Sequence, residues 1–165
     1  MKSAWVLALL GHADGAWVAG GDAGVSWTVT ASSQYDNCAA YDLCDYQYAV
    51  DGTSAGNGTT GKTLDLNGPL NVQYPQFVHI DFGAPLTVSR WRVWSGGDSY
   101  SGKDMSLKGV NGSLIAHAGG GAESEPFTAV TASNISVVIP SEWPSSNPSS
   151  AFQLYMTEIQ FFQEE

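Results

Sequence analysis

Short apolar stretches alternate with polar, glycine-containing turns along the chain, and the apolar spacing of an amphipathic helix is almost absent. In Trp27–Ala31 and Ser89–Trp94, bulky and polar residues alternate as in a strand with one buried face. Trp27, Trp91 and Phe161 are the expected core residues of such strands. Short strands separated by many turns predict an all-β fold, an antiparallel β-sandwich of the jelly-roll type. The predicted strands are Val25–Ala31, Phe77–Phe82, Leu86–Trp94, Met105–Val110, Ser113–Ala118, Phe127–Val130, Asn134–Ile139 and Phe152–Phe162.

The segments between these strands divide the chain further. Residues 34–48 and 51–69 are predicted to be long loops, and a loop of that length usually has a function or is tied down. Residues 1–25 form an N-terminal extension before a sandwich domain at 26–165. Its apolar run, Ala4–Leu10, fits either a hairpin with Ala16–Ala19 or a short signal peptide. No apolar run has the length of a membrane span, so we expect no membrane insertion.

Composition and charge exclude several classes of protein. Hydrophobic residues make up 43% of the chain, which is too high for a disordered protein. The net charge is −10, and the only arginines are Arg90 and Arg92. A nucleic-acid-binding protein needs many cations to replace the counterions of the phosphates, so nucleic acid is not an expected partner. Anionic membranes are disfavoured for the same reason.

The two cysteines, Cys38 and Cys44, lie six positions apart in one predicted loop. No histidine lies near them and there is no second cysteine pair, which argues against a zinc site. They fit a local disulfide that closes a small surface loop, or two free thiols. A disulfide implies an oxidising environment, so the expected location is extracellular, as a secreted protein or on the surface of a virion.

Residues for catalysis are few. His12, His79 and His117 are far apart, and the sequence holds no nucleophile elbow, phosphate loop or metalloprotease motif. His79 is most simply a residue on a sheet face. Glu123 and Glu125 stand on a glycine-rich loop, where a solvated pair of charges is the expected arrangement. We therefore expect a protein that is not an enzyme.

Six segments, in this order, resemble motifs of a known family: Thr30–Gln34, Ala49–Gly52, Gln76–Gly83, Val88–Val93, Ser106–Ser113 and Met156–Phe162. Together they resemble the discoidin and coagulation-factor type C domains, which are galactose-binding-like sandwiches related to carbohydrate-binding modules. The resemblance covers about residues 26–163. The cysteine loop and residues 1–25 are additions to the family pattern, and the tryptophan that often follows the Asp-Gly motif is missing.

The resemblance implies a structural calcium site. In this sequence the ligands would be Asp51, Thr59, Thr60 and Glu158, which would join the long loop at 51–69 to the last strand. Carboxylate, hydroxyl and carbonyl oxygens from a tight loop suit calcium. The alternative is an ordinary Asp-Gly turn in which Asp51 accepts hydrogen bonds from the backbone.

The resemblance also implies a binding face made of the loops 34–48, 95–103 and 141–150. Their aromatic and amide side chains are the candidate ligand-binding residues, namely Tyr35, Tyr41, Tyr46, Tyr100, Trp143 and Asn147. Aromatic rings cover the C–H faces of sugars, and the same rings also anchor protein interfaces. The predicted function is carbohydrate recognition or adhesion at a surface, with many copies displayed together. The alternative is a structural subunit, a decoration or fibre protein of a virus particle or extracellular assembly, whose partners are neighbouring subunits.

Overall fold

The structure is a computed structural model, which describes residues 15–22, 24–33, 45–53, 64–66, 74–95, 102–110, 112–114, 121–142 and 154–165. It confirms the all-β prediction: apart from one 3-10 turn, η1 (Tyr46–Ala49), the regular elements of these residues are strands. They are β1 (Gly15–Val18), β2 (Thr28–Ala31), β3 (Leu64–Leu66), β4 (Gln76–Ser95), β5 (Gly102–Lys103), β6 (Met105–Lys108), β7 (Ser113–Leu114), β8 (Ala122–Glu123), β9 (Val130–Ile139), β10 (Ser141–Glu142) and β11 (Leu154–Glu164).

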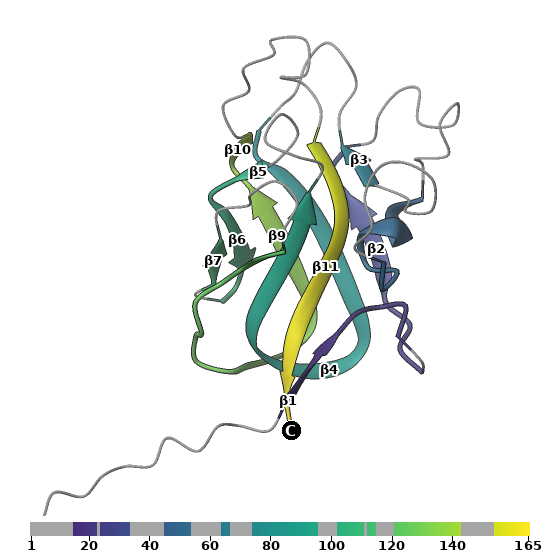
Figure 1. The fold of residues 1–165 in the computed structure, drawn as a ribbon, viewed down its shortest axis with the longest axis vertical. Coiled ribbons are helices and arrows are strands. Elements are labelled where there is room, and N and C mark those ends of the chain that lie inside the picture. The colour runs from purple at the N-terminus through teal and green to yellow at the C-terminus, as the bar shows by residue number, and fades with distance from the viewer. Residues whose placement is uncertain are drawn as a thin grey trace, which may run out of the picture.

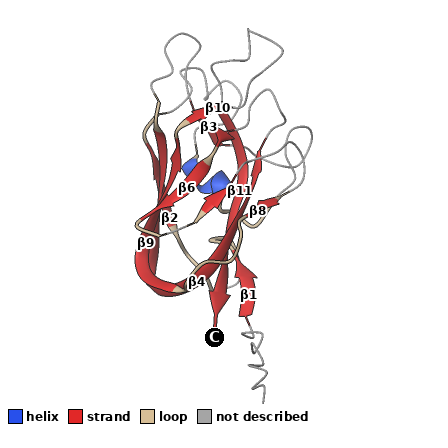
Figure 2. Ribbon diagram, turned by 90° about the vertical axis from the view of Figure 1, so that its left-hand side faces the viewer, coloured by secondary structure: helices blue, strands red, loops and turns tan. Residues whose placement is uncertain are grey.

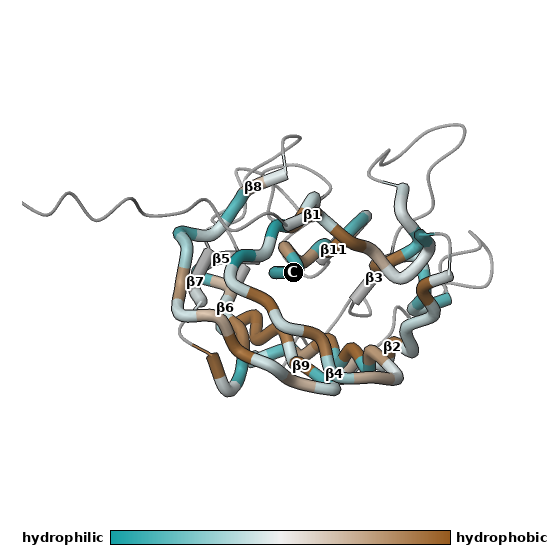
Figure 3. The backbone as a smooth tube through the Cα atoms, turned by 90° about the horizontal axis from the view of Figure 1, so that it is seen from below, coloured by the Kyte–Doolittle hydropathy of each residue, from teal (hydrophilic) through white to brown (hydrophobic). Residues whose placement is uncertain are grey.

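All strand pairs are antiparallel, and β4 joins the two layers of a sandwich. The order in the main sheet is β1-β11-β4-β9-β6-β7, with β2 and β8 paired to β4 and β3 paired to β11. The first half of β4 pairs with β2 and β9, and its second half pairs with β11 and β8. Seen from the end that carries the C-terminus, β1 and β11 lie across the interior from β2 and β9 (Figure 3).

The long strand β4 corrects one prediction. The sequence predicted two strands, 77–82 and 86–94, whereas the chain continues as one strand of 20 residues. It turns at Gly83, which has a φ of +72°, and the Asp81 carboxylate accepts the N–H of Gly83 at 2.8 Å. The pairing with β9 shifts register between Asp81 and Leu86. The chain therefore passes from one layer to the other without leaving the sheet.

Three further predictions were wrong in detail. Phe127–Val130 was predicted as a strand, but of these residues only Val130 belongs to one, β9. Leu64–Leu66 was assigned to the long loop 51–69, but it forms β3 and pairs with β11. Glu123 was expected as a solvated loop charge, but it lies in β8 and forms an ion pair with Arg90, with 3.1 Å between the charged atoms. Both strands are very short, so the pairing partner rather than the local pattern decides their conformation.

The core lies between the two layers. Val78 and Ile80 from the first half of β4 are fully buried, as are Trp91 and Val93 from its second half. The residues that alternate with the buried ones along each strand point away from this interior. The alternation predicted for β2 and β4 is therefore confirmed. The three aromatic residues predicted for the core are buried as well, with exposed fractions of 5%, 0% and 0% for Trp27, Trp91 and Phe161.

Part of the N-terminal extension belongs to the sandwich. β1 pairs with β11, so that Gly15 lies beside Glu164 and Val18 beside Phe161 (Figure 2). This strand overlaps the predicted arm Ala16–Ala19. The other arm of the predicted hairpin, residues 4–10, lies outside the described residues, and the domain boundary at residue 25 stays a prediction. Within the described part of the chain, no helix is long and apolar enough to cross a membrane.

Candidate functional site

Two of the three predicted binding loops have their bases at one end of the sandwich. β5 and β10 pair there, with Gly102 beside Glu142, so the loops 95–103 and 141–150 are joined at their bases. Ser95, at the end of β4, lies beside Met156 near the start of β11. Figure 1 shows β3, β5 and β10 at this end, far from the C-terminus. The fold thus gathers loops that are far apart in sequence.

Most of the predicted ligand-binding side chains lie outside the described residues, and their role stays a prediction: Tyr35, Tyr41, Tyr100, Trp143 and Asn147. The same holds for the predicted disulfide of Cys38 and Cys44. Tyr46 is described, as the first residue of η1. Its side chain is half-buried and packs against the core. The structure therefore gives Tyr46 a packing role, which leaves less of its ring for a ligand.

The Asp51 turn forms the centre of an acidic site. Asp45 begins η1 by accepting the N–H of Gln47 at 2.9 Å, and the turn carries the chain to Val50, which is buried. The Asp51 carboxylate then accepts the N–H of Thr53 at 2.8 Å. Burial raises the pKa of this carboxyl above its ordinary value, against the effect of the bond to Thr53.

Glu158 reaches this turn from β11. Gly52, with a φ of +84°, directs its N–H to Glu158 Oε2 at 3.1 Å. The Glu158 side chain is fully buried, and its Oε1 has no hydrogen-bond partner among the described residues. Burial, and then the negative charge of Asp51, raises the pKa of Glu158 to about 8. A buried carboxylate with one bare oxygen is costly unless something positive or a proton meets it.

The sequence did not predict the contribution of the N-terminal segment to this site. Asp22 accepts the N–H of Ala19 at 2.7 Å, and its negative charge adds to the rise in the pKa of Glu158. Gly21 lies so close to the turn that a Cβ at this position would be 2.0 Å from the carbonyl oxygen of Asp51. No motif signalled this contact, because Asp22 lies outside the family pattern.

The residues of this site fit a calcium ion. Calcium takes about six to eight oxygen ligands and tolerates a mixture of carboxylates and backbone carbonyls. Asp51 and Glu158 bring two carboxylates to one place, and Glu158 Oε1 is a buried oxygen that lacks a partner. Thr59 and Thr60 lie outside the described residues. Among the described residues, no three His, Cys, Asp or Glu side chains are grouped so as to hold a metal by themselves, so further ligands would have to come from backbone or hydroxyl oxygens.

Comparison with solved structures identifies the fold. A domain of the Streptococcus pneumoniae beta-galactosidase BgaA matches 83% of this chain and 96% of its own length, at 13% identity and a TM-score of 0.60. The family 32 carbohydrate-binding module of Clostridium perfringens NanJ, solved with galactose, matches 82% of this chain and 93% of its own, at 13% identity and a TM-score of 0.55. This chain has the fold of a family 32 carbohydrate-binding module. The likeness to the discoidin-type fold implied by the sequence is thereby confirmed.

Other matched family 32 folds are also binding domains taken from larger enzymes. Chitosan-binding module 1 of the Paenibacillus sp. IK-5 chitosanase/glucanase matches 81% of this chain and 92% of its own, at 19% identity and a TM-score of 0.54. The matched domains are non-catalytic modules, several of them from glycoside hydrolases. No protein-family model matches the sequence, and no curated protein matches it either.

Proposed function

We propose that this chain is a non-catalytic carbohydrate-binding module that recognises a glycan through the loops 34–48, 95–103 and 141–150. The observation that supports it most is the family 32 fold, because the matched modules bind sugars: galactose, GalNAc-β-1,3-galactose and chitosan. The pairing of β5 with β10 supports the choice of loops, since it joins two of them at their bases. The candidate rings for stacking on the sugar are Tyr35, Tyr41, Tyr100 and Trp143, with Tyr46 as a packing residue.

Calcium is the proposed structural ion of the module. Asp51 and Glu158 would hold it, with Thr59 and Thr60 as the further ligands that the family resemblance implies. The ion would supply the positive charge that the buried Glu158 carboxylate lacks, and it would fix the Asp51 turn against β11. Its expected role is therefore to hold in place the base of the segment between Asp51 and β3.

A single sugar site of this kind binds weakly, so we propose display in many copies outside the cell. Linking several weak sites raises the overall affinity by about 10²–10⁴ without any new contact. In such an assembly, neighbouring protein subunits would be the second class of partner. The predicted disulfide of Cys38 and Cys44 fits such a location.

A glycan array tests the proposal. The protein is probed as a monomer and as a tetramer on a biotin–streptavidin support, in calcium. We expect terminal galactose, GalNAc or glucosamine glycans to bind the tetramer, with the monomer affinity in the millimolar range. The variants Tyr41→Ala, Tyr100→Ala and Trp143→Ala test the loops one at a time.

His79→Ala is the matched control, because His79 lies exposed on a sheet face and contacts Ser136 of β9 rather than the loops. Binding by the tetramer that falls in the loop variants and persists in His79→Ala supports the proposal. Absence of any glycan signal from a folded tetramer contradicts it. Full binding in all three loop variants contradicts the assignment of the loops.

A further inference from the structure

The outward face of the second half of β4 carries the only two arginines of a strongly acidic chain. Trp91 and Val93 point into the core, so the alternation of the strand places Arg90, Arg92 and Trp94 on the opposite face, where each is half-buried. None of these three residues has a role in the proposed loop site or in the calcium site. Aromatic residues of the neighbouring strands complete the face.

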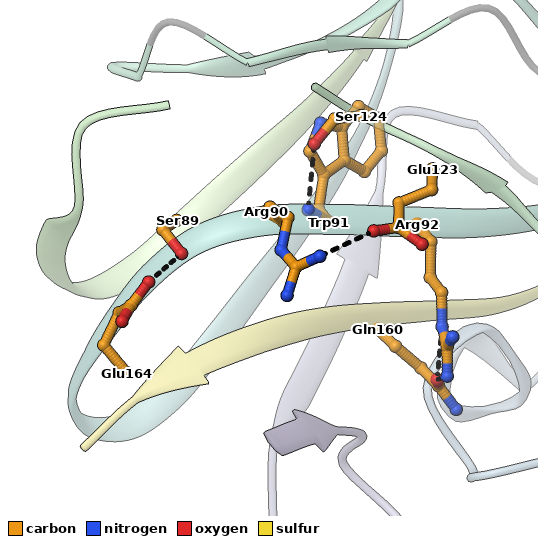
Figure 4. A network of polar contacts seen from close by, with 8 residues as sticks. All are labelled: Ser89, Arg90, Trp91, Arg92, Glu123, Ser124, Gln160 and Glu164. Atoms are coloured by element: carbon orange, nitrogen blue, oxygen red, sulfur yellow. Dashed lines mark hydrogen bonds and ion pairs between the residues drawn. The ribbon is translucent and has the colours of Figure 1, made fainter. Parts of the chain in front are cut away.

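Arg92 lies between two tryptophans. Its guanidinium carbon is 4.1 Å from the ring centre of Trp17 in β1 and 4.8 Å from that of Trp94. Its Nε and Nη2 both donate to Oε1 of Gln160, at 2.9 and 2.6 Å (Figure 4). Gln160 is uncharged, and Nη1 makes no hydrogen bond within the described residues. The guanidinium is therefore held rigidly, with one nitrogen and its charge still available.

Arg90 lies beside it in the same face. Its guanidinium carbon is 4.0 Å from the ring centre of Phe162 and 5.5 Å from that of Trp17. Its Nη1 forms the ion pair with Glu123 at 3.1 Å, and both side chains of this pair are partly exposed, at 30% and 41%. Trp17, Arg92 and Trp94, together with this pair, thus form an alternating row of rings and cations, which we call the Trp17–Trp94 face.

The charges of this face are unequal. Two guanidinium groups meet one partner carboxylate, that of Glu123, so the ion pairs of the described residues leave one positive charge unmatched. Burial lowers the pKa of Arg92, and the nearest carboxylates, Glu123 and Glu158, raise it again without reaching ion-pair distance. Arginine at such a site stays charged at any pH at which the protein is folded.

A second observation concerns the surroundings of Trp17 and Trp94. Trp17 lies in β1, which is the outer strand of the sheet at this side. Gly121 packs directly against the Trp94 ring. A Cβ at position 121 would lie 2.5 Å from the ring, so only glycine fits there. Trp17 is half-buried, with Arg92 at 4.1 Å over its ring and Phe162 edge-on at 5.6 Å between ring centres. The ring of Trp17 therefore lies at the edge of the sheet, with Arg92 over one of its faces.

We propose that the Trp17–Trp94 face is a second carbohydrate site, which binds a pyranose that carries one carboxylate, such as a uronic acid. The proposal rests on the proposed function only for the class of ligand, a sugar. Arg92 would bind the carboxylate through Nη1, the guanidinium nitrogen that Gln160 leaves available, in a charge-assisted hydrogen bond. Trp17 would lie against the C–H face of the ring. The ligand therefore needs both a carboxylate, which Arg92 binds, and a sugar ring, which packs against Trp17.

The net charge of −10 argues for a single carboxylate rather than a polyanion. A long acidic polysaccharide would bring many negative charges close to an acidic protein, and the repulsion would oppose binding. One carboxylate at the only arginines gains the local attraction and adds little repulsion. The binding is expected to weaken in salt, because the site lies at the surface.

The experiment uses a matched pair of probes, methyl β-D-glucuronide and methyl β-D-glucoside, which differ only in the carboxylate. Binding to the whole protein is followed in calcium by NMR, through the indole N–H signals of Trp17 and Trp94. We expect the glucuronide to bind at least five times more tightly than the glucoside and to shift both signals. Sodium acetate, which has the charge without the ring, should bind at least five times more weakly than the glucuronide.

Three variants separate recognition from folding. Arg92→Gln removes the charge and should bring the ratio of glucuronide to glucoside affinity to about one. Arg92→Lys keeps the charge but loses the paired hydrogen bonds to Gln160 that hold the guanidinium in place, and should keep part of the ratio. Trp17→Ala should lower the affinity for both sugars, and His79→Ala is the control. Thermal melting shows which variants stay folded, so a loss is counted only in a folded variant.

The outcomes decide this site independently of the loop site. A carboxylate-dependent shift of both signals that Arg92→Gln abolishes supports it, whatever the glycan array shows. Equal binding of the two sugars, acetate that binds as tightly as the glucuronide, or a ratio unchanged in Arg92→Gln overturns it. Neutral glycans that bind the loops while the glucuronide shifts no indole signal overturn this site and leave the proposed function standing.

Discussion

Asp51 and Asp81 make the same local hydrogen bond in two different places. Each carboxylate accepts the N–H of the residue two positions ahead, Thr53 or Gly83, and both distances are 2.8 Å. Each turn also contains a glycine with positive φ, Gly52 at +84° and Gly83 at +72°. The Asp81 turn is exposed and only redirects β4. The Asp51 turn lies against the buried carboxylate of Glu158, which is 106 residues after Gly52 in the chain.

The difference shows what separates a turn from a candidate metal site. The local geometry of the two turns is the same, so it does not distinguish a metal site from an ordinary turn. What differs is the residue brought by another strand: Glu158, fully buried and with one oxygen bare. The second carboxylate raises the free energy of the folded chain unless a proton or a cation joins it. The predictions below use Asp81 and other exposed positions as controls for this difference.

The largest expected effect is on the pH dependence of stability without calcium. The pKa of Glu158 is raised from 4.5 to about 8 in the folded chain, so the unfolded chain loses this proton first. The folded state then loses stability as pH rises above about 4.5, and the loss is complete above about 8, where it reaches up to about 5 kcal/mol. Denaturant unfolding in chelator, from pH 5 to 9, measures it.

Calcium should remove this dependence and should bind more tightly as pH rises through about 8, because the proton and the ion compete for the same carboxylate. A free energy of unfolding in chelator that does not fall between pH 5 and 9 would contradict the burial of a charged Glu158.

Glu158→Gln should have the next largest effect, with opposite signs in the two conditions. At a calcium concentration 100 times the dissociation constant, the wild-type chain gains about 2.7 kcal/mol, and the variant should lose this gain. In chelator at pH 8 the variant should be more stable than the wild type, because a neutral amide replaces a buried charge. A variant that still gains stability from calcium would exclude Glu158 as a ligand.

Gly21→Ala tests the contact between the N-terminal segment and the Asp51 turn. The added Cβ would meet the Asp51 carbonyl oxygen at 2.0 Å, so the turn must move, at a cost of about 1–3 kcal/mol. The calcium-dependent rise in melting temperature should shrink at the same time. Gly109→Ala is the control, since Gly109 has a φ of +86° in open space and suffers only backbone strain. Equal losses of calcium response in both variants would refute the contact.

The smallest expected effect, on calcium affinity, comes from the pair of substitutions that compares the two turns directly. Asp51→Asn keeps an oxygen but loses a charge, and calcium affinity should fall about tenfold, which is about 1.4 kcal/mol. Asp81→Asn keeps the same turn in an exposed place and should change stability by less than about 0.5 kcal/mol, with calcium affinity unchanged. Calorimetric titration of both variants measures it. The interpretation fails if the two variants lose calcium affinity equally.

The sequence predicted the fold class well because alternation reports directly on burial. Trp27 and Val29 face the core and Thr28 and Thr30 face outward, as the pattern indicated. Asp51 was identified as a candidate ligand through its motif, and Glu158 through the closing strand of the family. Their meeting through Gly52 depends on the antiparallel pairing of β11, which no local pattern contains.

Other features of the structure could not be predicted from a single sequence. The continuity of β4 was hidden by Gly83, Ala84 and Pro85, which look like the end of a strand but only bend it. The contribution of Asp22 was missed because it stands in the extension. The approach of Trp17 to Arg92 joins residues 75 positions apart through an edge strand of four residues. Such contacts follow from strand order, which propensity does not determine.

The pairing of β1 with β11 has a practical consequence for anyone who handles this fold as a building block. Gly15 and Glu164 are neighbours across one ladder, so the outer ends of the first and last described strands lie side by side, and β5 and β10, at the bases of two candidate loops, are at the far end (Figure 1). A host protein can therefore receive the module inside one of its surface turns with little change in the spacing of that turn. Joining 15 to 164 by a short linker and opening the chain elsewhere should give a circular permutant that keeps the pairing of β1 with β11.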